Sequence, residues 1–155
     1  MFELSEDHAA VRAMAREFAR NEVLPGAAER DRTHVFPADL VRQLGELGLL
    51  GMIIPQDYGG AGLDVLGYVL AIEELSYADA GLGVIVSVQN SLASWPILTF
   101  GTDAQKRRYL PALASGERIG CYALTEPQAG SNPADIRASA VKKGDRYILN
   151  GEKIY

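Results

Sequence analysis

The 155-residue sequence lacks several features that mark particular classes of protein. Its single cysteine, Cys121, cannot form an intrachain disulfide, which fits a reducing compartment best. Its two histidines, His8 and His34, are far apart in the sequence, so no metal site is expected. Lysine and arginine number 15 against 20 aspartates and glutamates, giving a formal charge of -5. Because no basic field would attract phosphates, nucleic acid is not an expected partner.

Long hydrophobic runs are also missing. Residues 1–21 carry charges throughout, whereas a secretory signal peptide needs an unbroken apolar region. The longest apolar stretch, residues 81–88, is far shorter than the roughly 20 residues of a membrane-spanning helix. We therefore expect a cytoplasmic protein with no membrane span. With 48% hydrophobic residues, the chain is still apolar enough to bury a core.

Residues 1–116 have the spacing of amphipathic helices. Ser5 precedes two acidic residues, and its hydroxyl can accept a hydrogen bond from an early backbone N–H. Thr102 and Gln105 match a capping box, so a helix is predicted to run from there until Gly116 closes it. Other helices are predicted to begin near Pro37, Asp64 and Leu82, and the first helix is predicted to end at Pro25 and Gly26.

Three further segments carry predictions about packing. Between Leu82 and Leu92 apolar residues go nearly all round the helix axis, which is typical of a central helix surrounded by protein. Residues 49–54 are predicted to be a buried edge. Residues 59–62 are glycine-rich but lack the G-x-G-x-x-G spacing of a phosphate-binding loop, so they are predicted to be a turn.

Short β-like runs follow Gly116. They cover residues 119–124, 138–142, 146–150 and 152–155, with a hairpin turn predicted at residues 143–145. Because the last strand has barely begun at Tyr155, the sheet would expose unpaired backbone groups. We therefore expect an α+β protein, truncated as given, with a helical bundle over residues 1–116 and the start of a β domain over residues 117–155.

Functional chemistry is most plausible in residues 121–132, where a predicted strand ends in a loop. This loop contains the hydroxyls of Thr125 and Ser131, several small residues and a proline. Backbone N–H groups and the two hydroxyls could bind a polar, planar ligand. The alternative is an ordinary strand-to-loop transition, which the spacing alone favours.

Residues 122–131, with the sequence YALTEPQAGS, closely resemble the flavin-binding signature of the acyl-CoA dehydrogenase family. Four more segments resemble landmarks of that family and follow in family order: residues 54–63, 100–106, 109–111 and 149–153. The five segments extend over almost the whole chain. On this resemblance the chain is identified as a member of the family.

The resemblance implies a helical amino-terminal domain, residues 1–116, and the first strands of a β-barrel-like middle domain, residues 117–155. A carboxy-terminal helical domain of the family is absent from this chain. The implied cofactor is FAD, lying between the middle domain and the absent domain. The residues implied to bind it are Tyr122, Leu124, Thr125, Gly130, Ser131 and Tyr155, with the Thr125 hydroxyl as a hydrogen-bond donor to the isoalloxazine ring.

The implied substrate is an acyl-CoA thioester, sandwiched against the flavin ring. Gly130 and Ser131 are implied to lie where the cofactor meets the pantetheine part of the substrate. Val84, Ser87 and Val88 are implied to help wall the slot for the acyl chain. The alternative for these three residues, plain core packing, has equal weight.

Two positions depart from the family pattern. Asn132 stands where the family usually has an aspartate, which puts any role of a negative charge there in doubt. Tyr155, the last residue, stands where a second flavin-contacting element typically begins with tryptophan. An aromatic ring is kept at that position, but the rest of the element does not follow.

The activity that the resemblance implies is α,β-dehydrogenation of an acyl-CoA to a trans-2-enoyl-CoA. The glutamate base of the family lies in the absent domain, so no catalytic residue is assigned in this chain and the fragment alone is expected to be inactive. The implied partners are identical subunits in a tetramer and an electron-transfer flavoprotein as electron acceptor. Alternatives are an acyl-CoA oxidase, a flavin monooxygenase-like relative or a non-catalytic helical scaffold.

Three other candidate sites have weaker support. Glu73 and Glu74 could be an acid–base pair, but adjacent helical residues point about 100° apart, so a solvated face is favoured. Trp95 is expected to be a core or interface aromatic. Ser131 is not expected to be a hydrolase nucleophile, because no G-x-S-x-G motif surrounds it.

Overall fold

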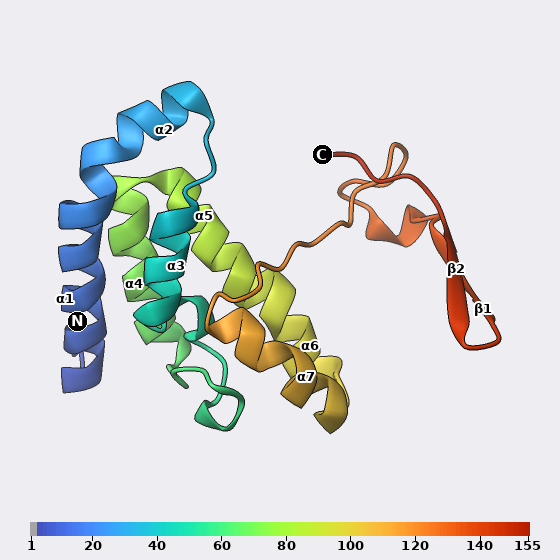
Figure 1. The fold of residues 1–155 in the computed structure, drawn as a ribbon, viewed down its shortest axis with the longest axis horizontal. Coiled ribbons are helices and arrows are strands. Elements are labelled where there is room, and N and C mark those ends of the chain that lie inside the picture. The colour runs from blue at the N-terminus through green and yellow to red at the C-terminus, as the bar shows by residue number, and fades with distance from the viewer. Residues whose placement is uncertain (1–2) are drawn as a thin grey trace. The chain divides into compact units, whose positions relative to one another are not determined.

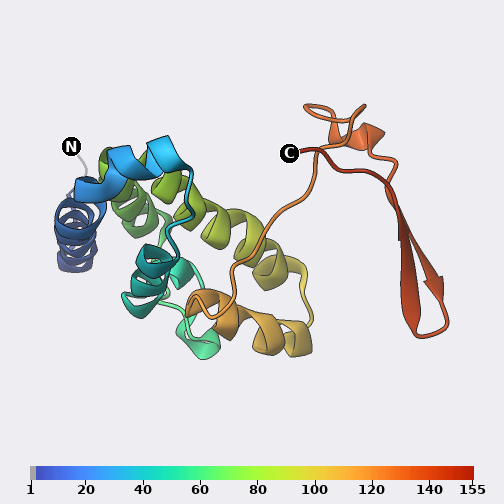
Figure 2. The ribbon, with the colours of Figure 1, turned by 45° about the horizontal axis from the view of Figure 1, so that its top comes forward.

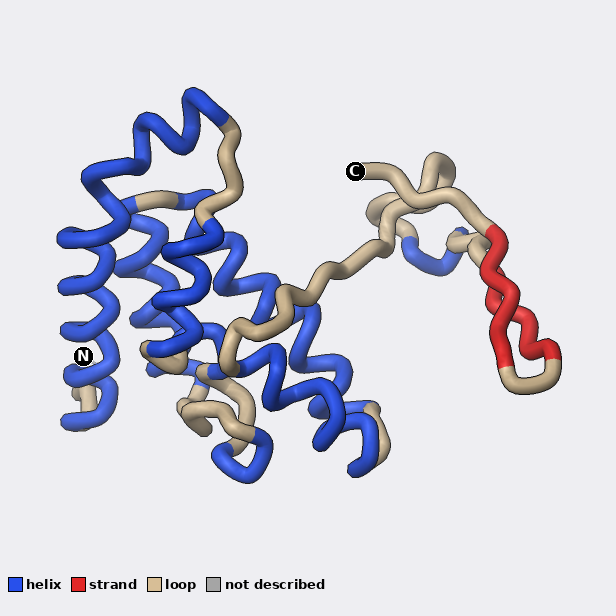
Figure 3. The backbone as a smooth tube through the Cα atoms, in the orientation of Figure 1, coloured by secondary structure: helices blue, strands red, loops and turns tan. Residues whose placement is uncertain are grey.

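The computed structural model describes residues 3–155, which form two compact units, one that ends at Cys121 and one that covers Tyr122–Tyr155. The first unit is helical and the second contains a two-stranded hairpin (Figures 1 and 3). This confirms the predicted α+β class, with helices first and strands after them. The helices are α1 (Glu6–Phe18), α2 (Ala27–Thr33), α3 (Ala38–Glu46), α4 (Val65–Ala78), α5 (Ala80–Val88), α6 (Trp95–Phe100) and α7 (Asp103–Ala114).

Side-chain caps explain where three of these helices begin. The Ser5 hydroxyl accepts a hydrogen bond from the His8 N–H at 3.2 Å, and the Asp64 carboxylate accepts one from the Gly67 N–H at 2.9 Å. Thr102 forms the predicted capping box before α7. Each cap satisfies a backbone donor that the first helical turn leaves unpaired. The predicted starts at these three residues are confirmed.

The core of the helical unit lies between α1, α3, α4 and α5. Helix α1 packs along α4, as Figures 1 and 2 both show. The fully buried residues between the helices are mostly leucine, valine and alanine. The predicted buried edge at residues 49–54 is confirmed, although it adopts a 3₁₀ turn (Leu49–Gly51) instead of a strand. Four of its apolar side chains, Leu49, Leu50, Met52 and Ile54, are each at most 1% exposed, and Ile53 is half-buried.

The predicted end of the first helix at Pro25 and Gly26 is wrong. A π-helical segment (Ala19–Val23) and a 3₁₀ turn (Leu24–Gly26) continue α1 directly into α2. Pro25 lies in the first turn of a new helical segment, where its missing N–H costs no hydrogen bond. The chain turns away only at His34, which has the left-handed φ of 56°.

The prediction of a central helix at residues 82–92 is correct for one face only. Leu82 and Val86 are buried, but Val84 is 60% exposed and Leu92 is 42% exposed. The π-helical segment Gln89–Ser94 joins α5 to α6, so one helix extends over Ala80–Phe100. By length and composition this 21-residue helix could cross a membrane, contrary to the expectation from the apolar run alone.

Gln89 and Asn90 interrupt the apolar run in the sequence, but the helix continues through them. Gln89 is 1% exposed, and its Nε2 donates to the carbonyls of Leu113 and Arg118 at 2.8 and 3.0 Å. Asn90 is fully buried, and its Nδ2 donates to the Leu49 carbonyl at 3.0 Å. These bonds tie the helix to the rest of its unit, which supports its interpretation as a core helix.

The compact helical unit extends past Gly116, where the sequence analysis placed the domain boundary. The Gly120 N–H donates to Gln89 Oε1 at 2.8 Å, and the Arg118 N–H donates to the Ala112 carbonyl at 2.9 Å. These bonds hold residues 117–120 against the π-helical segment Gln89–Ser94 and against α7. The second unit accordingly begins at Tyr122.

The second unit contains the predicted hairpin. Strands β1 (Ser139–Lys143) and β2 (Arg146–Asn150) pair antiparallel with Lys143 opposite Arg146. Gly144 has a φ of 64°, which glycine adopts readily at such a turn. The predicted strands at residues 119–124 and 152–155 are wrong, because these segments lack the repeated backbone pairing that defines a strand; Ile154 donates one bond to Thr125.

The cap of α7 provides a stability prediction. The Gln105 N–H donates to Thr102 Oγ1 at 3.3 Å, and the Thr102 N–H donates to Gln105 Oε1 at 2.8 Å. Thr102→Ala removes the first bond and should lower the free energy of unfolding of the helical unit by about 1 kcal/mol. Urea unfolding followed by circular dichroism measures this loss. The control is Thr99→Ala, at an exposed position in α6, which should change stability by less than about 0.5 kcal/mol.

Candidate functional site

The loop predicted to bind a ligand forms a tight bend in the second unit. The Glu126 N–H donates to the Ala129 carbonyl at 2.9 Å, and the Ala129 N–H donates back to the Glu126 carbonyl at 3.0 Å. Pro127 and Gln128 form the turn between them. The bend therefore has a fixed backbone, with the segment that holds Thr125 entering it and Gly130 leaving it.

Several residues of the bend are exposed. Tyr122 is 50% exposed, and Ser131 is also exposed. Leu124 and Thr125 are half-buried. A Cβ placed on Gly130 would meet no atom within 4 Å, so the space beside this residue is clear. An open, mixed polar and apolar surface of this kind fits a planar ligand such as a flavin ring.

Two segments that are distant in sequence meet at the bend. The Lys153 Nζ donates to the Leu124 carbonyl at 2.8 Å, and the Ile154 N–H donates to the Thr125 carbonyl at 3.0 Å. Tyr155, which follows directly, is fully exposed. The predicted cofactor residues on both segments are thus brought into one neighbourhood within the second unit.

Glu126 has no role predicted from the sequence, although it is one of the most constrained residues of this neighbourhood. It is 3% exposed, and its pKa is lowered to about 2. The main cause is the hydrogen bond from the Arg137 N–H at 2.7 Å, followed by the hydrogen bond from the Lys153 Nζ at 2.9 Å. Both favour the ionised carboxylate. These two partners lie 11 and 27 residues further along the chain, so no local motif reveals them.

Asn132, the departure from the family pattern, has a clear local role. Its Oδ1 accepts a hydrogen bond from the Ala134 N–H at 3.3 Å, and its Nδ2 donates to Asp135 Oδ2 at 2.8 Å. It caps the 3₁₀ turn Pro133–Asp135. An amide performs this role with a donor and an acceptor, which a carboxylate could not do.

The residues predicted to wall the acyl slot lie in the helical unit on α5. Val84, Ser87 and Val88 are spaced i, i+3 and i+4, so they share one face of the helix. Val84 is largely exposed and Val88 is half-buried. The Ser87 hydroxyl is hydrogen-bonded to the Tyr68 hydroxyl at 2.8 Å. The three residues form a mixed surface on α5, and their contact with an acyl chain stays a prediction.

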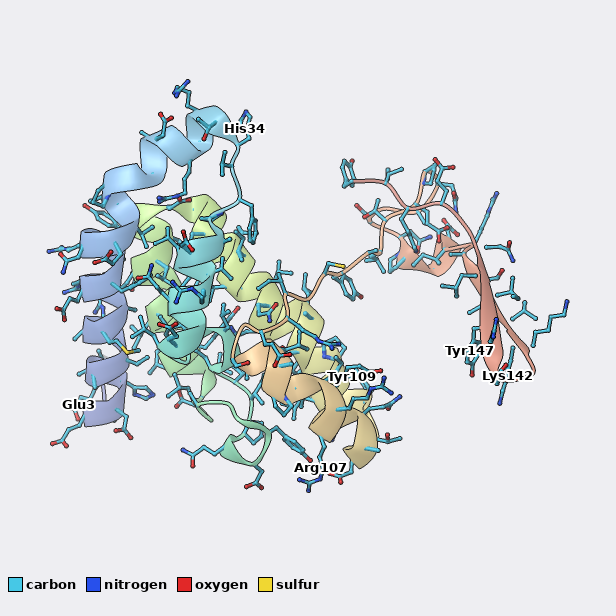
Figure 4. The ribbon with its side chains drawn as sticks, viewed as in Figure 1. Glu3, His34, Arg107, Tyr109, Lys142 and Tyr147 are labelled. Atoms are coloured by element: carbon cyan, nitrogen blue, oxygen red, sulfur yellow. The ribbon has the colours of Figure 1, made fainter. Side chains whose placement is uncertain are left out.

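Residues of two resemblance segments, 54–63 and 100–106, meet in a structural cluster. The Tyr58 hydroxyl donates to Asp103 Oδ1 at 3.0 Å, and the Arg107 guanidinium lies 5.6 Å from the centre of the Tyr58 ring. Figure 4 labels Arg107 and Tyr109 on α7. Gly59 and Gly62 have φ values of 81° and 66°, which confirms the predicted turn. This cluster docks the glycine-rich turn on α7.

The prediction of a solvated face at Glu73 and Glu74 is wrong for Glu74. Glu74 is 8% exposed, and its carboxylate accepts hydrogen bonds from Arg16 at 2.6 and 2.9 Å and from Arg12 at 2.8 Å. These bonds, first those from Arg16, lower its pKa to about 2. Glu73 stays exposed. Glu74 is therefore a structural ion-pair partner that joins α4 to α1.

Two other sequence predictions concern Trp95 and metals. Trp95 is 49% exposed, so it is not a core residue of its unit, and the interface alternative remains. Among residues 3–155 no group of three or more histidine, cysteine, aspartate or glutamate side chains could hold a metal ion.

Comparison with known proteins defines the class to which this fold belongs. Residues 5–117 match the family model described as the N-terminal domain of acyl-CoA dehydrogenase. The chain is 45% identical to an acyl-CoA dehydrogenase of Bacillus subtilis over 98% of this chain and 40% of that protein. It is 47% identical to a short-chain specific acyl-CoA dehydrogenase of Clostridium acetobutylicum over 99% of this chain and 41% of that protein.

Solved structures agree with this class. One from Acidaminococcus fermentans, described under electron transferring flavoprotein and flavin-based electron bifurcation, has a TM-score of 0.96 and 46% identity over 100% of this chain and 41% of that chain. Butyryl-CoA dehydrogenase from Megasphaera elsdenii has a TM-score of 0.94 and 37% identity over 100% and 42% of the two chains. An acyl-CoA dehydrogenase from Bacillus anthracis, complexed with FAD, has a TM-score of 0.91 and 38% identity over 97% and 26%.

The helical unit thus matches the amino-terminal domain of acyl-CoA dehydrogenases. The chain belongs to the acyl-CoA dehydrogenase family. It spans about 40% of the length of the curated relatives it matches.

Proposed function

We propose that the protein containing this segment is an FAD-dependent dehydrogenase that oxidises an acyl-CoA thioester to a trans-2-enoyl-CoA. The observation that carries this proposal is the open bend at residues 122–131, tied by Lys153 and Ile154 to the segment that ends at Tyr155. The FAD complex of a similar chain supports the cofactor. The relatives named as short-chain or butyryl-CoA dehydrogenases make a short acyl-CoA the first substrate to test.

The residues of this chain would bind and orient the two reactants. Tyr122 and Leu124 offer apolar surface to the isoalloxazine ring, and the Thr125 hydroxyl offers a hydrogen-bond donor, which favours a more electron-rich ring. Gly130 leaves the space beside the bend clear, and Ser131 adds an exposed hydroxyl. When bound, FAD supplies the acceptor for hydride removed from the substrate. The proton-abstracting base is assigned to no residue of this chain.

The proposal extends to partners and location. We infer that the full-length protein is a homotetramer, that it passes electrons to an electron-transfer flavoprotein, and that it is cytoplasmic. The similar chain described with an electron transferring flavoprotein supports the electron acceptor. The assembly and the location are carried by the family resemblance and by the sequence.

Anaerobic titration of the full-length protein tests the reaction. The purified protein should carry a visible flavin spectrum, and butyryl-CoA should bleach it without oxygen. A colourless protein that takes up no added FAD would exclude the proposed function and favour a non-catalytic scaffold. Rapid recovery of the oxidised spectrum in air, with hydrogen peroxide released, would favour an acyl-CoA oxidase over a dehydrogenase.

Thr125→Ala tests the assignment of the donor to the flavin ring. The change deletes the hydroxyl from a half-buried position beside the open bend, so the flavin midpoint potential of the full-length protein should fall and the visible spectrum should shift. Spectroelectrochemical titration measures both. Thr125→Ser keeps the hydroxyl and should restore values near those of the wild type. A potential that Thr125→Ala leaves unchanged would exclude this role.

A further inference from the structure

The centre of the second unit is a carboxylate. Of residues 122–155, all of which the structure describes, only Glu126 and Ala129 are buried, at 3% and 2% exposure. The carboxylate has hydrogen-bond partners in three separate segments of this unit. Glu126 is therefore placed where it can control how these segments lie against one another.

Both oxygens of Glu126 are fully used. Oε2 accepts hydrogen bonds from Gln128 Nε2 at 2.6 Å and from the Arg137 N–H at 2.7 Å. Oε1 accepts them from the Ala138 N–H at 3.0 Å and from Lys153 Nζ at 2.9 Å. A carboxylate offers about four lone-pair sites, so this one has no acceptor capacity left. Its partners come from the bend, from the start of the hairpin and from the segment after it.

Lys153 links Glu126 to the residues proposed to contact the flavin ring. Besides Glu126, its ammonium group donates to the Leu124 carbonyl at 2.8 Å. The next residue, Ile154, donates its N–H to the Thr125 carbonyl at 3.0 Å. The two residues before Glu126 and the segment before Tyr155 are thus fixed against each other by one ion pair and two hydrogen bonds. A shift of Glu126 or Lys153 would move both sides of the proposed flavin contact.

We propose that Glu126 and Lys153 are a positioning pair. Together they set the spacing between the segment of Leu124 and Thr125 and the segment of Ile154 and Tyr155, and this spacing determines how tightly the flavin ring is bound. This inference rests on the proposed function, since it assumes that the bend holds FAD. Neither side chain is assigned a contact to the ring. Both act through the backbone of Leu124, Thr125 and Tyr155, which are assigned such contacts.

Glu126→Gln in the full-length protein is the first test. Glutamine keeps the shape but replaces one acceptor oxygen with an NH₂ group, which would face N–H or ammonium donors. The dissociation constant of FAD, measured by flavin fluorescence on the apoprotein, should rise about tenfold or more, and the flavin midpoint potential should shift. Glu152→Gln is the matched control, because it makes the same chemical change at an exposed residue of the same unit, and both values should stay as in the wild type.

Lys153→Met is the second test, and it tests the positioning role by itself if Glu126→Gln does not fold. Methionine keeps the apolar stem and loses both hydrogen bonds of the ammonium group, so FAD should again bind more weakly and the potential should shift. Lys153→Arg restores a cationic donor and should recover part of the affinity. Lys142→Met on the exposed hairpin is the control, and it should leave both values unchanged (Figure 4).

The result that overturns the inference is a normal FAD dissociation constant and a normal midpoint potential in Glu126→Gln and Lys153→Met, even with a lower melting temperature. The pair would then stabilise the hairpin without positioning the cofactor. Failure of the proposed function gives a different result, because the wild-type protein would then bind no FAD in the same assay.

Discussion

Leu75→Ala should lower the free energy of unfolding of the helical unit by about 3 kcal/mol. Leu75 lies on α4, is 0% exposed and belongs to the main buried cluster between α1, α3, α4 and α5. Truncation removes buried apolar surface and leaves a cavity that close-packed neighbours fill only in part; such changes cost about 2–5 kcal/mol. Urea unfolding of the 155-residue chain, followed by helical circular dichroism, measures the loss.

Val69→Ala is the matched control for this prediction. Val69 lies on the same helix, but it is 50% exposed, so its truncation should cost less than about 1 kcal/mol. Equal losses for the two variants would show that α4 does not bury the face that contains Leu75. The comparison therefore tests the orientation of α4, on which the packing of α1 and α5 depends.

Glu74→Gln should have the second largest effect, and the effect should depend on pH. At neutral pH the variant loses charge-assisted hydrogen bonds from Arg16 and Arg12 to a buried carboxylate, which should cost about 2 kcal/mol. The arginines lower the pKa of Glu74 from its usual 4.5 to about 2. A carboxyl group whose pKa is lowered by folding stabilises the folded state fully above the unfolded value.

That stabilisation is lost as the pH falls from about 4.5 toward 2, because the folded state then takes up the proton as well. The stability difference between the wild type and Glu74→Gln should therefore shrink over this range. Urea unfolding at several pH values measures it. Glu73→Gln is the control, because Glu73 is 63% exposed and its contact with Arg12, at 3.5 Å, is long and weak. A difference that stays constant down to pH 3 would contradict the assigned cause.

Local features of this fold could be predicted from the sequence. The helix starts at Ser5, Asp64 and Thr102 depend on a side chain and a backbone N–H within the next three residues, so the local sequence contains all of the information. The hairpin turn at Gly144 is similarly local. The class, helices followed by strands, follows from the change in hydrophobic spacing after Gly116.

Features that depend on distant partners could not be predicted in this way. Glu74 is buried because two arginines of α1 neutralise it, and its own helix gives no indication of them. Pro25 does not end a helix, because the π-helical segment before it places the proline in a new first turn. The exposure of Val84 depends on which face of α5 the other helices cover.

The candidate site also has features that the sequence predicts and features that depend on distant partners. Thr125 and Ser131 were found through a contiguous motif, and the structure shows that this motif forms an open bend. Glu126 belongs to the same motif, but its importance depends on Arg137, Ala138 and Lys153. Sequence comparison can identify such a residue as part of a motif, whereas its hydrogen-bond partners explain what it does.

A crystal structure of the full-length protein with FAD decides whether the bend at residues 122–131 holds the flavin. The isoalloxazine ring should lie against the bend, with the Thr125 hydroxyl about 3 Å from a ring heteroatom and Tyr155 beside the ring. A ring bound elsewhere, or a bend closed over Thr125 and Ser131, would show that this loop is not the flavin site.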